Sequence, residues 1–296
     1  MKFRKKWVKI AMIVVFLLVI LIPLTVMVVS KHFTAQEQAI RDDWSEEVSS
    51  LVGTDEEEKV RLNDAGLESD LPILRLVPFE IEKEGFTYYD TDVQDRLRGT
   101  LETLKEFRTD WDADAPLAVL NPYGTGSNGL YLYFTTDYAT KISYTISVED
   151  DSILDYSAVA RDSSAKEYTK EHEFQIIGLV PGKTNKVTMT MTGTWGNMRK
   201  KVSFEITMPE NKSGYPTQLE YTQGESVNEL SDGLYAMMRT NGYLGYGFFF
   251  DNEGVMRYEM VLEGYGLDRI LDQGDGTILT CVSSSKLARM DGVGQT

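Results

Sequence analysis

The sequence predicts a mainly β protein with an N-terminal transmembrane helix, a helical connector, an immunoglobulin- or fibronectin-III-like β-sandwich and the first blade of an incomplete β-propeller. Three observations lead to this prediction. A twenty-residue apolar run spans residues 10–29. Apolar and polar side chains alternate over much of Leu117 to Met208, and an Asp-x-x-Gly turn recurs after forty residues near the C-terminus. Alternation is typical of half-buried strands, and repeats of about forty residues are typical of propeller blades.

Residues 1–30 are expected to form a cytoplasmic basic tail and a membrane anchor. A helix over residues 10–29, at ~1.5 Å per residue, would span the ~30 Å hydrocarbon core of a bilayer. Five basic residues and no acidic one precede the run, which favours a cytoplasmic N-terminus and an extracytoplasmic location for the rest of this single-pass cell-membrane protein. A cleaved signal peptide is the alternative, because Val28-Val29-Ser30 resembles a cleavage site, but signal-peptide apolar regions usually span about 7–15 residues.

Residues 31–115 are expected to form a helical stalk or connector. Apolar residues at helical spacing make two stripes, the first of Ile40, Trp44, Val48 and Leu51, and the second of Val93, Leu97, Leu101, Leu104 and Trp111. The second stripe predicts a helix through Arg108. Between the stripes, residues 71–84 contain Pro72 and Pro78 and are expected to be extended.

Residues 116–209 are predicted to form the β-sandwich. The clearest alternating runs cover residues 142–148, 187–191 and 202–206, and turn residues separate them. Six or seven short strands in about 95 residues are typical of immunoglobulin and fibronectin type III domains. Residues 210–229, rich in Gly, Ser, Thr and Asn, are then expected to form a linker.

Residues 230–296 are predicted to begin a β-propeller. Asp251 and Asp291 are forty residues apart, as are Gly254 and Gly294, and an apolar strand precedes each turn. A propeller needs roughly 4–8 blades to close. The sequence holds one blade and the opening of a second, so we expect it to be the N-terminal piece of a longer protein.

Composition excludes several classes of function. The formal net charge of −16 argues against a nucleic-acid-binding protein, because few cations are available to displace phosphate counterions. The single cysteine, Cys281, excludes an internal disulfide and a cysteine-built metal site. With only His32 and His172, a histidine-built metal centre is not expected either. We therefore predict neither a metal nor a cofactor.

Two motifs suggest ligand binding but fit turns better. Residues 178–184, Gly-Leu-Val-Pro-Gly-Lys-Thr, resemble a nucleotide P-loop, but three residues instead of four separate the glycines, and a strand-like pattern follows where a helix is required. Residues 272–276 suggest calcium, but they lack the ligand spacing of an EF-hand, and Asp275-Gly276 is typical of a hairpin.

His172 is the one candidate general base, because Glu171 and Glu173 flank it and would raise its pKa. No nucleophile motif accompanies it, which favours an exposed residue at a strand edge. His32 is expected at the membrane interface. We assign no catalytic, cofactor-binding or metal-binding residue.

Three further features are short runs or single residues. The aromatic run Tyr243–Phe250 could stack on a sugar, although a buried strand is the favoured interpretation. Cys281 is expected to be a small buried apolar residue. Asn211-Lys212-Ser213 is a glycosylation sequon whose use would depend on the host.

Four stretches together resemble the bacterial arylsulfate sulfotransferases. Leu120-Asn121-Pro122-Tyr123-Gly124, Glu171-His172-Glu173 and Gly178–Val187 resemble their N-terminal β-sandwich domain, and Phe250–Tyr258 is similar to the first strands of the propeller that follows it. The resemblance covers residues 116–296. It implies nucleotide-independent transfer of a sulfuryl group from a phenolic sulfate ester to a phenol, through a transiently sulfated histidine in the propeller channel.

The resemblance supplies no catalytic residue for this chain. No histidine follows His172, and His172 lies in the sandwich part of the motif. The 296 residues alone are therefore expected to be inactive, although the intact protein would be an enzyme. The alternatives are a membrane-tethered extracellular β-sandwich that binds a glycan or a protein, and a structural collar of a membrane complex. Donor, acceptor and oligomeric state stay open, and membrane lipid is the expected partner of residues 10–29.

Overall fold

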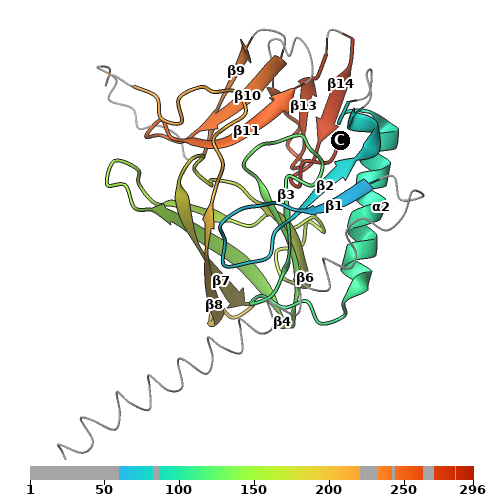
Figure 1. The fold of residues 1–296 in the computed structure, drawn as a ribbon. Helices are drawn as coiled ribbons and strands as arrows, with labels where there is room; N and C mark the ends of the chain where they lie inside the picture. The colour runs from blue at the N-terminus through green and yellow to red at the C-terminus, as the bar shows by residue number, and fades with distance from the viewer. Residues whose placement is uncertain are drawn as a thin grey trace, which may run out of the picture. The chain divides into compact units, whose positions relative to one another are not determined.

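A curled β-sheet of eight strands forms the larger part of the structure (Figure 1). The computed structural model describes residues 60–82, 87–220, 224, 233–241, 244–262, 270–283 and 285–296, all within one compact unit from Ser50 to Thr296. The predicted anchor at residues 10–29 and the first helical stripe lie outside these residues. Within the described ranges, no helix is both long and apolar enough to cross a bilayer.

The eight strands follow the order β1-β2-β3-β4-β7-β8, and β5 and β6 both pair with β4. Their bounds are β1 Val60–Asp64, β2 Leu74–Pro78, β3 Leu117–Leu120, β4 Leu130–Val148, β5 Tyr156–Val159, β6 Thr169–Ile176, β7 Thr184–Gly193 and β8 Met198–Thr207. The segment after β1 bonds to β8, with the Thr207 amide donating to the Glu68 carbonyl at 2.8 Å and the Asp70 amide to the Glu205 carbonyl at 3.0 Å. These bonds bring the two ends of the sheet together, which accounts for its curl.

Strand β4 is long enough to pair with two different sets of strands along its length. Its first part pairs with β3 and β6, its second part pairs with β5 and β7, and the β6 register shifts between Thr135 and Thr140. The predicted alternation is present here: Ile142, Tyr144 and Ile146 are buried. The predicted sandwich strands therefore exist, but this one strand connects them into a continuous sheet.

The region before the sandwich contributes both strands and a helix. Helix α2 spans Thr91–Phe107 and buries the residues of the second predicted stripe, Val93, Leu97, Leu101 and Leu104. Trp111 lies beyond its end and is buried as well, and its indole donates to the Lys105 carbonyl at 3.0 Å. The extended segment predicted around Pro72 and Pro78 contains β2, which a short 3-10 turn, η1 (Phe79–Glu82), follows. Strands β1 and β2, which the helical interpretation of residues 31–115 did not include, join the eight-stranded sheet.

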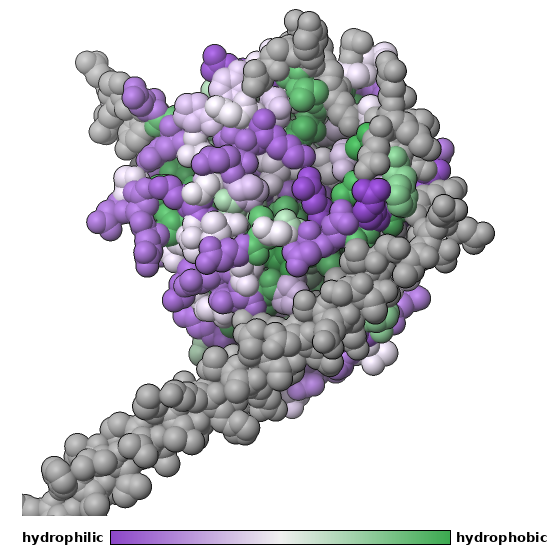
Figure 2. All heavy atoms as spheres, viewed as in Figure 1, coloured by the Kyte–Doolittle hydropathy of each residue, from purple (hydrophilic) through white to green (hydrophobic). Residues whose placement is uncertain are grey.

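Two antiparallel sheets of three strands each make up the C-terminal β region, which we define as residues 233–296. One has the order β11-β10-β9, from Met256–Leu262, Leu244–Phe250 and Tyr235–Asn241. The other has the order β12-β13-β14, from Ile270–Asp272, Ile278–Cys281 and Leu287–Met290. Met260 and Leu262 pack with Val282 and Met290, so the two sheets share a core. The face of the molecule in Figure 2 is mainly hydrophilic, with apolar side chains showing only in patches.

The predicted forty-residue repeat is present as two turns with the same hydrogen bonds. In the first, the Asp251 amide donates to the Val255 carbonyl at 3.0 Å, and the Asp251 carboxylate accepts from the Val255 amide at 2.8 Å. In the second, Asp291 and Gln295 make both bonds at 2.9 Å. Gly254 and Gly294 have φ of 75° and 88°, the left-handed region that favours glycine. The Asp-x-x-Gly spacing thus predicted both turns, and the structure shows that they share the same hydrogen bonds.

The outer edge of β11 is covered by a loop of the sandwich. Between β3 and β4, the Ser127 amide donates to the Glu259 carbonyl at 3.0 Å, and the Val261 amide donates to the Thr125 carbonyl at 2.9 Å. Gly126 forms an antiparallel bridge with Met260 between these bonds. Residues 125–128 therefore act as a fourth strand, and β11 has partners on both sides.

Candidate functional site

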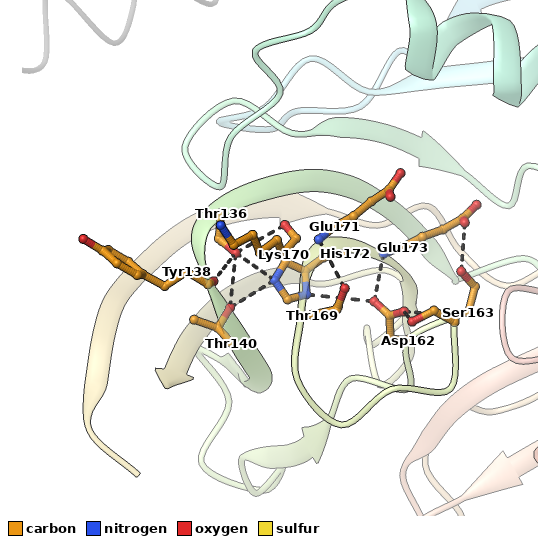
Figure 3. Close-up of polar contacts among 11 residues, drawn as sticks. Thr136, Tyr138, Thr140, Asp162, Ser163, Thr169, Lys170, Glu171, His172 and Glu173 are labelled. Atoms are coloured by element: carbon orange, nitrogen blue, oxygen red, sulfur yellow. Dashed lines mark hydrogen bonds and ion pairs between the residues drawn. The ribbon is translucent and has the colours of Figure 1, made fainter. Parts of the chain in front are cut away.

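His172 is buried, with 1% of its surface exposed, so the predicted exposed position at a strand edge is wrong. Its side chain lies on the inner face of β6 with those of Phe174 and Ile176, and its ring lies 5.0 Å from that of Phe134 on β4. Figure 3 shows its polar neighbours: Nε2 is 3.0 Å from the Thr140 hydroxyl and 3.2 Å from the Thr136 hydroxyl. Because each hydroxyl can donate or accept, Nε2 finds a hydrogen-bond partner in either tautomer of a neutral imidazole.

The neighbouring glutamates do not act on the imidazole as the sequence suggests. Glu171 and Glu173 point to the opposite face of β6 (Figure 3), where their carboxylates accept from Tyr133 at 2.8 Å and Tyr131 at 2.7 Å. Burial instead lowers the pKa of His172 from its ordinary value of 6.5, and the Asp162 carboxylate only partly opposes this effect. The predicted upward shift of the His172 pKa is therefore wrong in sign.

The carboxylate of Glu173 belongs to a separate ion-pair cluster that attaches helix α2 to the sheet. Lys105 of α2 lies 2.6 Å from it, and Ser163 donates to its other oxygen at 2.8 Å. Burial alone would raise the pKa of Glu173, but the hydrogen bonds from Lys105 and Tyr131 outweigh burial and lower it. Glu173 is therefore ionised and fully paired, which indicates a structural role.

The hydroxyl, imidazole and carboxylate around His172 follow the order of a hydrolase triad, but not its geometry. Asp162 Oδ2 is 3.9 Å from His172 Nδ1, which is too long for a hydrogen bond. Thr140 is only 2% exposed, so its hydroxyl is largely shielded from solvent. A small pocket is lined by Thr140, Asp162 and His172, together with Lys166 and Thr169. His172 is therefore a buried residue in the core of the sandwich.

The buried neutral state of His172 predicts a loss of stability in acid. Because the native pKa lies below the unfolded value, the unfolded chain binds the proton first, and the free energy of unfolding should fall as the pH drops below about 6.5. The contribution of this group is at most ~1.4 kcal/mol per pH unit. Urea titrations between about pH 8 and pH 5 should show a shallower decline for His172→Gln than for the wild type. Equal slopes in the two proteins would contradict this account.

Both suspected ligand motifs form turns, as the sequence favoured. Residues 178–184 form the turn between β6 and β7, with φ of +106° at Gly178 and +70° at Gly182, and β7 follows as a strand. Residues 272–276 form the hairpin turn between β12 and β13, in which the Asp272 carboxylate accepts from the Gly274 amide at 2.8 Å. Nowhere in the described ranges do three His, Cys, Asp or Glu side chains converge as a metal site would require.

The aromatic run is a buried strand, as the sequence favoured. Tyr246, Phe248 and Phe250 are 3–4% exposed and pack with Met256. Because these rings face a core, the described part of the run offers no face for stacking on a sugar. The glycan-binding alternative thus loses the feature that suggested it.

Two smaller features differ from their sequence interpretation. Cys281 is half-buried, and the preceding Thr280 takes the inward position of β13. In the sequon, the Asn211 amide donates to the Tyr215 carbonyl at 2.6 Å, and Ser213 is 3% exposed. A glycan on Asn211 would break this turn. His32 lies outside the described residues.

Arg257 was not singled out from the sequence, yet it holds the most buried cationic group at the junction between the sandwich and the C-terminal β region. Its side chain is 1% exposed and pairs with Asp251, with Nε 2.5 Å from Oδ2. The guanidinium also donates to the Leu154 carbonyl at 2.8 Å and lies over the ring of Tyr156, 5.1 Å from its centroid. One side chain therefore joins the first repeated turn to the loop and strand around β5.

Asn128 makes the second buried polar link across this junction. Its side-chain amide donates to the Leu179 carbonyl at 2.7 Å, and its side-chain oxygen accepts from the Glu259 amide at 2.8 Å. The residue is 1% exposed, so both bonds are protected from water. Such fully bonded buried polar groups fix the relative position of the elements that they join.

Comparison with known families finds a match for two successive regions of the described structure. Residues 117–209, which contain β3 to β8, match the arylsulfotransferase Ig-like domain, and residues 219–296, which contain β9 to β14, match the arylsulfotransferase (ASST) family. Together the two matches cover more than half of the 296 residues. No curated protein matches the chain. The immunoglobulin-like interpretation of residues 116–209 is thereby confirmed, and the chain belongs to the arylsulfotransferase family.

Proposed function

We propose that this chain supplies the immunoglobulin-like domain and the first propeller strands of an arylsulfate sulfotransferase. The observation that carries the proposal is the match of residues 117–209 and 219–296 to the two arylsulfotransferase models in succession. The buried links through Arg257 and Asn128 support it, because they join the two matched regions into one unit. The donor would be a phenolic sulfate ester and the acceptor a phenol.

The proposed reaction needs an accessible histidine. A ring nitrogen would attack the sulfur while the bond from sulfur to the aryl oxygen breaks and the phenolate leaves. The acceptor phenol would then take the sulfuryl group, lose its proton and regenerate the histidine. Cationic side chains would stabilise the developing negative charge. His172 is too deeply buried for this role, so we place the nucleophile in propeller residues beyond the 296 of this sequence.

We further propose that the protein works outside the cytoplasm, held by residues 10–29. The apolar length of that run and the basic residues before it support this location. Retention of the full chain in membranes after carbonate extraction would support it, and release into the soluble fraction would count against it.

The activity is tested with 4-nitrophenyl sulfate as donor and phenol as acceptor. We expect the 296-residue chain to release 4-nitrophenolate no faster than buffer. The protein encoded by the reading frame continued past codon 296 should turn the donor over, and should do so equally with His172→Gln. Turnover by the 296-residue chain would refute the proposal that the nucleophile lies outside these residues. An inactive extended protein would refute the proposed reaction.

A further inference from the structure

Three large apolar side chains are strongly exposed at one end of the eight-stranded sheet. Trp195, in the turn between β7 and β8, is 89% exposed, Met198 at the start of β8 is 65% exposed, and Tyr138 in β4 is 62% exposed. Thr140 pairs with Gly193, which brings the Tyr138 segment beside this turn. In Figure 3 the Tyr138 side chain points away from the His172 cluster. These side chains do not contribute to the core.

Basic residues accompany the exposed apolar ones. Arg199, Lys200 and Lys201 follow Met198 directly, in a chain whose formal net charge is −16. The Arg199 guanidinium lies 5.1 Å from the centroid of the Tyr138 ring, and Lys200 pairs with Asp114. We call Tyr138, Trp195, Met198, Arg199 and Lys201 the sandwich tip. Asp137 is the carboxylate next to Tyr138 in the sequence, so the tip and its neighbour retain a positive charge.

We infer that the sandwich tip rests on the surface of a lipid bilayer that contains anionic headgroups. Tryptophan and tyrosine partition to the interface between lipid and water, and lysine and arginine beside them are attracted to anionic lipids. Exposure of the tryptophan and the methionine to water leaves both apolar side chains free to enter the interface. The tip thus combines both kinds of residue that interfacial binding requires.

The length of chain before the described residues permits this contact. Thirty residues separate the end of the predicted anchor at Val29 from Val60. Fully extended they would reach roughly 100 Å, so the connection leaves every face of the domain free to meet the membrane. Contact through the tip would turn that face of the domain toward the membrane. The β13–β14 turn, which lies at the opposite end of the structure in Figure 1, would then point away from the lipid. This inference does not depend on sulfuryl transfer, but it rests on the membrane anchoring proposed for residues 10–29.

The test uses the full chain in nanodiscs of phosphatidylcholine and phosphatidylglycerol that contain a headgroup-nitroxide lipid. In a Cys281→Ser background, Thr194→Cys carries a fluorophore beside Trp195, and Ser285→Cys carries the same fluorophore in the exposed β13–β14 turn as the matched control. We expect the nitroxide to quench position 194 about two-fold, as for an interfacial group, and to leave position 285 nearly unchanged.

Variants of the tip make the test specific. Trp195→Ser with Met198→Ser, and separately Arg199→Gln with Lys201→Gln, should each restore the fluorescence at position 194. The charge variant should act only in discs with phosphatidylglycerol. Because these residues are exposed, circular dichroism melts should be unchanged. Equal quenching at both positions, or quenching that the tip variants do not alter, would overturn the inference. A tip that instead binds a protein would give no quenching in these discs, which would also overturn it.

Discussion

Arg257→Met is expected to lower the free energy of unfolding by about 3–5 kcal/mol, the usual cost of leaving one member of a buried ion pair without the other. Asp251 would keep its bonds to the amides of its own turn, but its second oxygen would lose the guanidinium at 2.5 Å. The Leu154 carbonyl would lose its donor as well. Urea unfolding of the full chain in detergent, followed by tryptophan fluorescence, measures the change, because Trp111 is buried in the native state.

The repeated turn provides the matched control for this prediction. Asp291 makes the same bonds to the amides of its turn, but burial raises its pKa, and the described residues place no basic side chain in an ion pair with it. Asp291→Asn keeps an acceptor oxygen and removes a poorly solvated charge, so it should cost less than about 1 kcal/mol. Asp251→Asn should cost several times more. Equal effects at the two positions would show that the Arg257 pair adds nothing to stability.

Asn128→Ala is expected to cost about 2–4 kcal/mol, the second largest effect. The substitution leaves the Leu179 carbonyl and the Glu259 amide buried without their partners, and each unsatisfied group costs about 1–3 kcal/mol. The cost should appear as one cooperative transition, because the two regions share buried contacts. Urea unfolding monitored by circular dichroism measures it.

A second amide at this junction serves as the control for Asn128. Gln218 donates to the Ser152 carbonyl at 3.2 Å, but it is exposed, so water can replace the lost partner in Gln218→Ala. We expect a change within about 0.5 kcal/mol. A cost as large as that of Asn128→Ala would mean that burial does not determine the energetics of this junction.

Much of the fold could be predicted because it depends on local patterns. The alternation over residues 142–148 predicts strand β4, and the helical spacing from Val93 to Leu104 predicts α2. Forty-residue spacing predicts two equivalent turns, since Asp and Gly at these positions fix the same backbone bonds. Strand β1 was missed, because residues 60–64 were assigned to the helical connector. Strand β2 was predicted only as an extended segment, because the prolines beside it favour an extended backbone without indicating a partner strand.

The errors concern side chains whose environment comes from distant elements. The burial of His172 could have been predicted, because His172, Phe174 and Ile176 are spaced two apart and so lie on the same face of a strand. Its charged neighbours in the sequence suggested a surface position instead. Arg257 has no such signal in the sequence. Residues 256–260 are all buried, so alternation cannot show which side chains face the core. The hydrogen-bond partners of Arg257 lie six, about eighty and about a hundred residues away in the sequence. A buried pair of this kind is visible only once the fold has brought its members together.

The loop that covers β11 has a consequence for the order in which the protein folds during synthesis. Domains generally fold as units while the ribosome is still adding residues, the N-terminal ones first. Residues 125–128 leave the ribosome more than a hundred residues before β11 and can already be held between β3 and β4. Residues 125–128 are then already in place when Met256–Leu262 is synthesised. The edge of β11 can pair with them at once, so it is not exposed to other nascent chains. The immunoglobulin-like domain thus acts as an intramolecular template for the region translated after it.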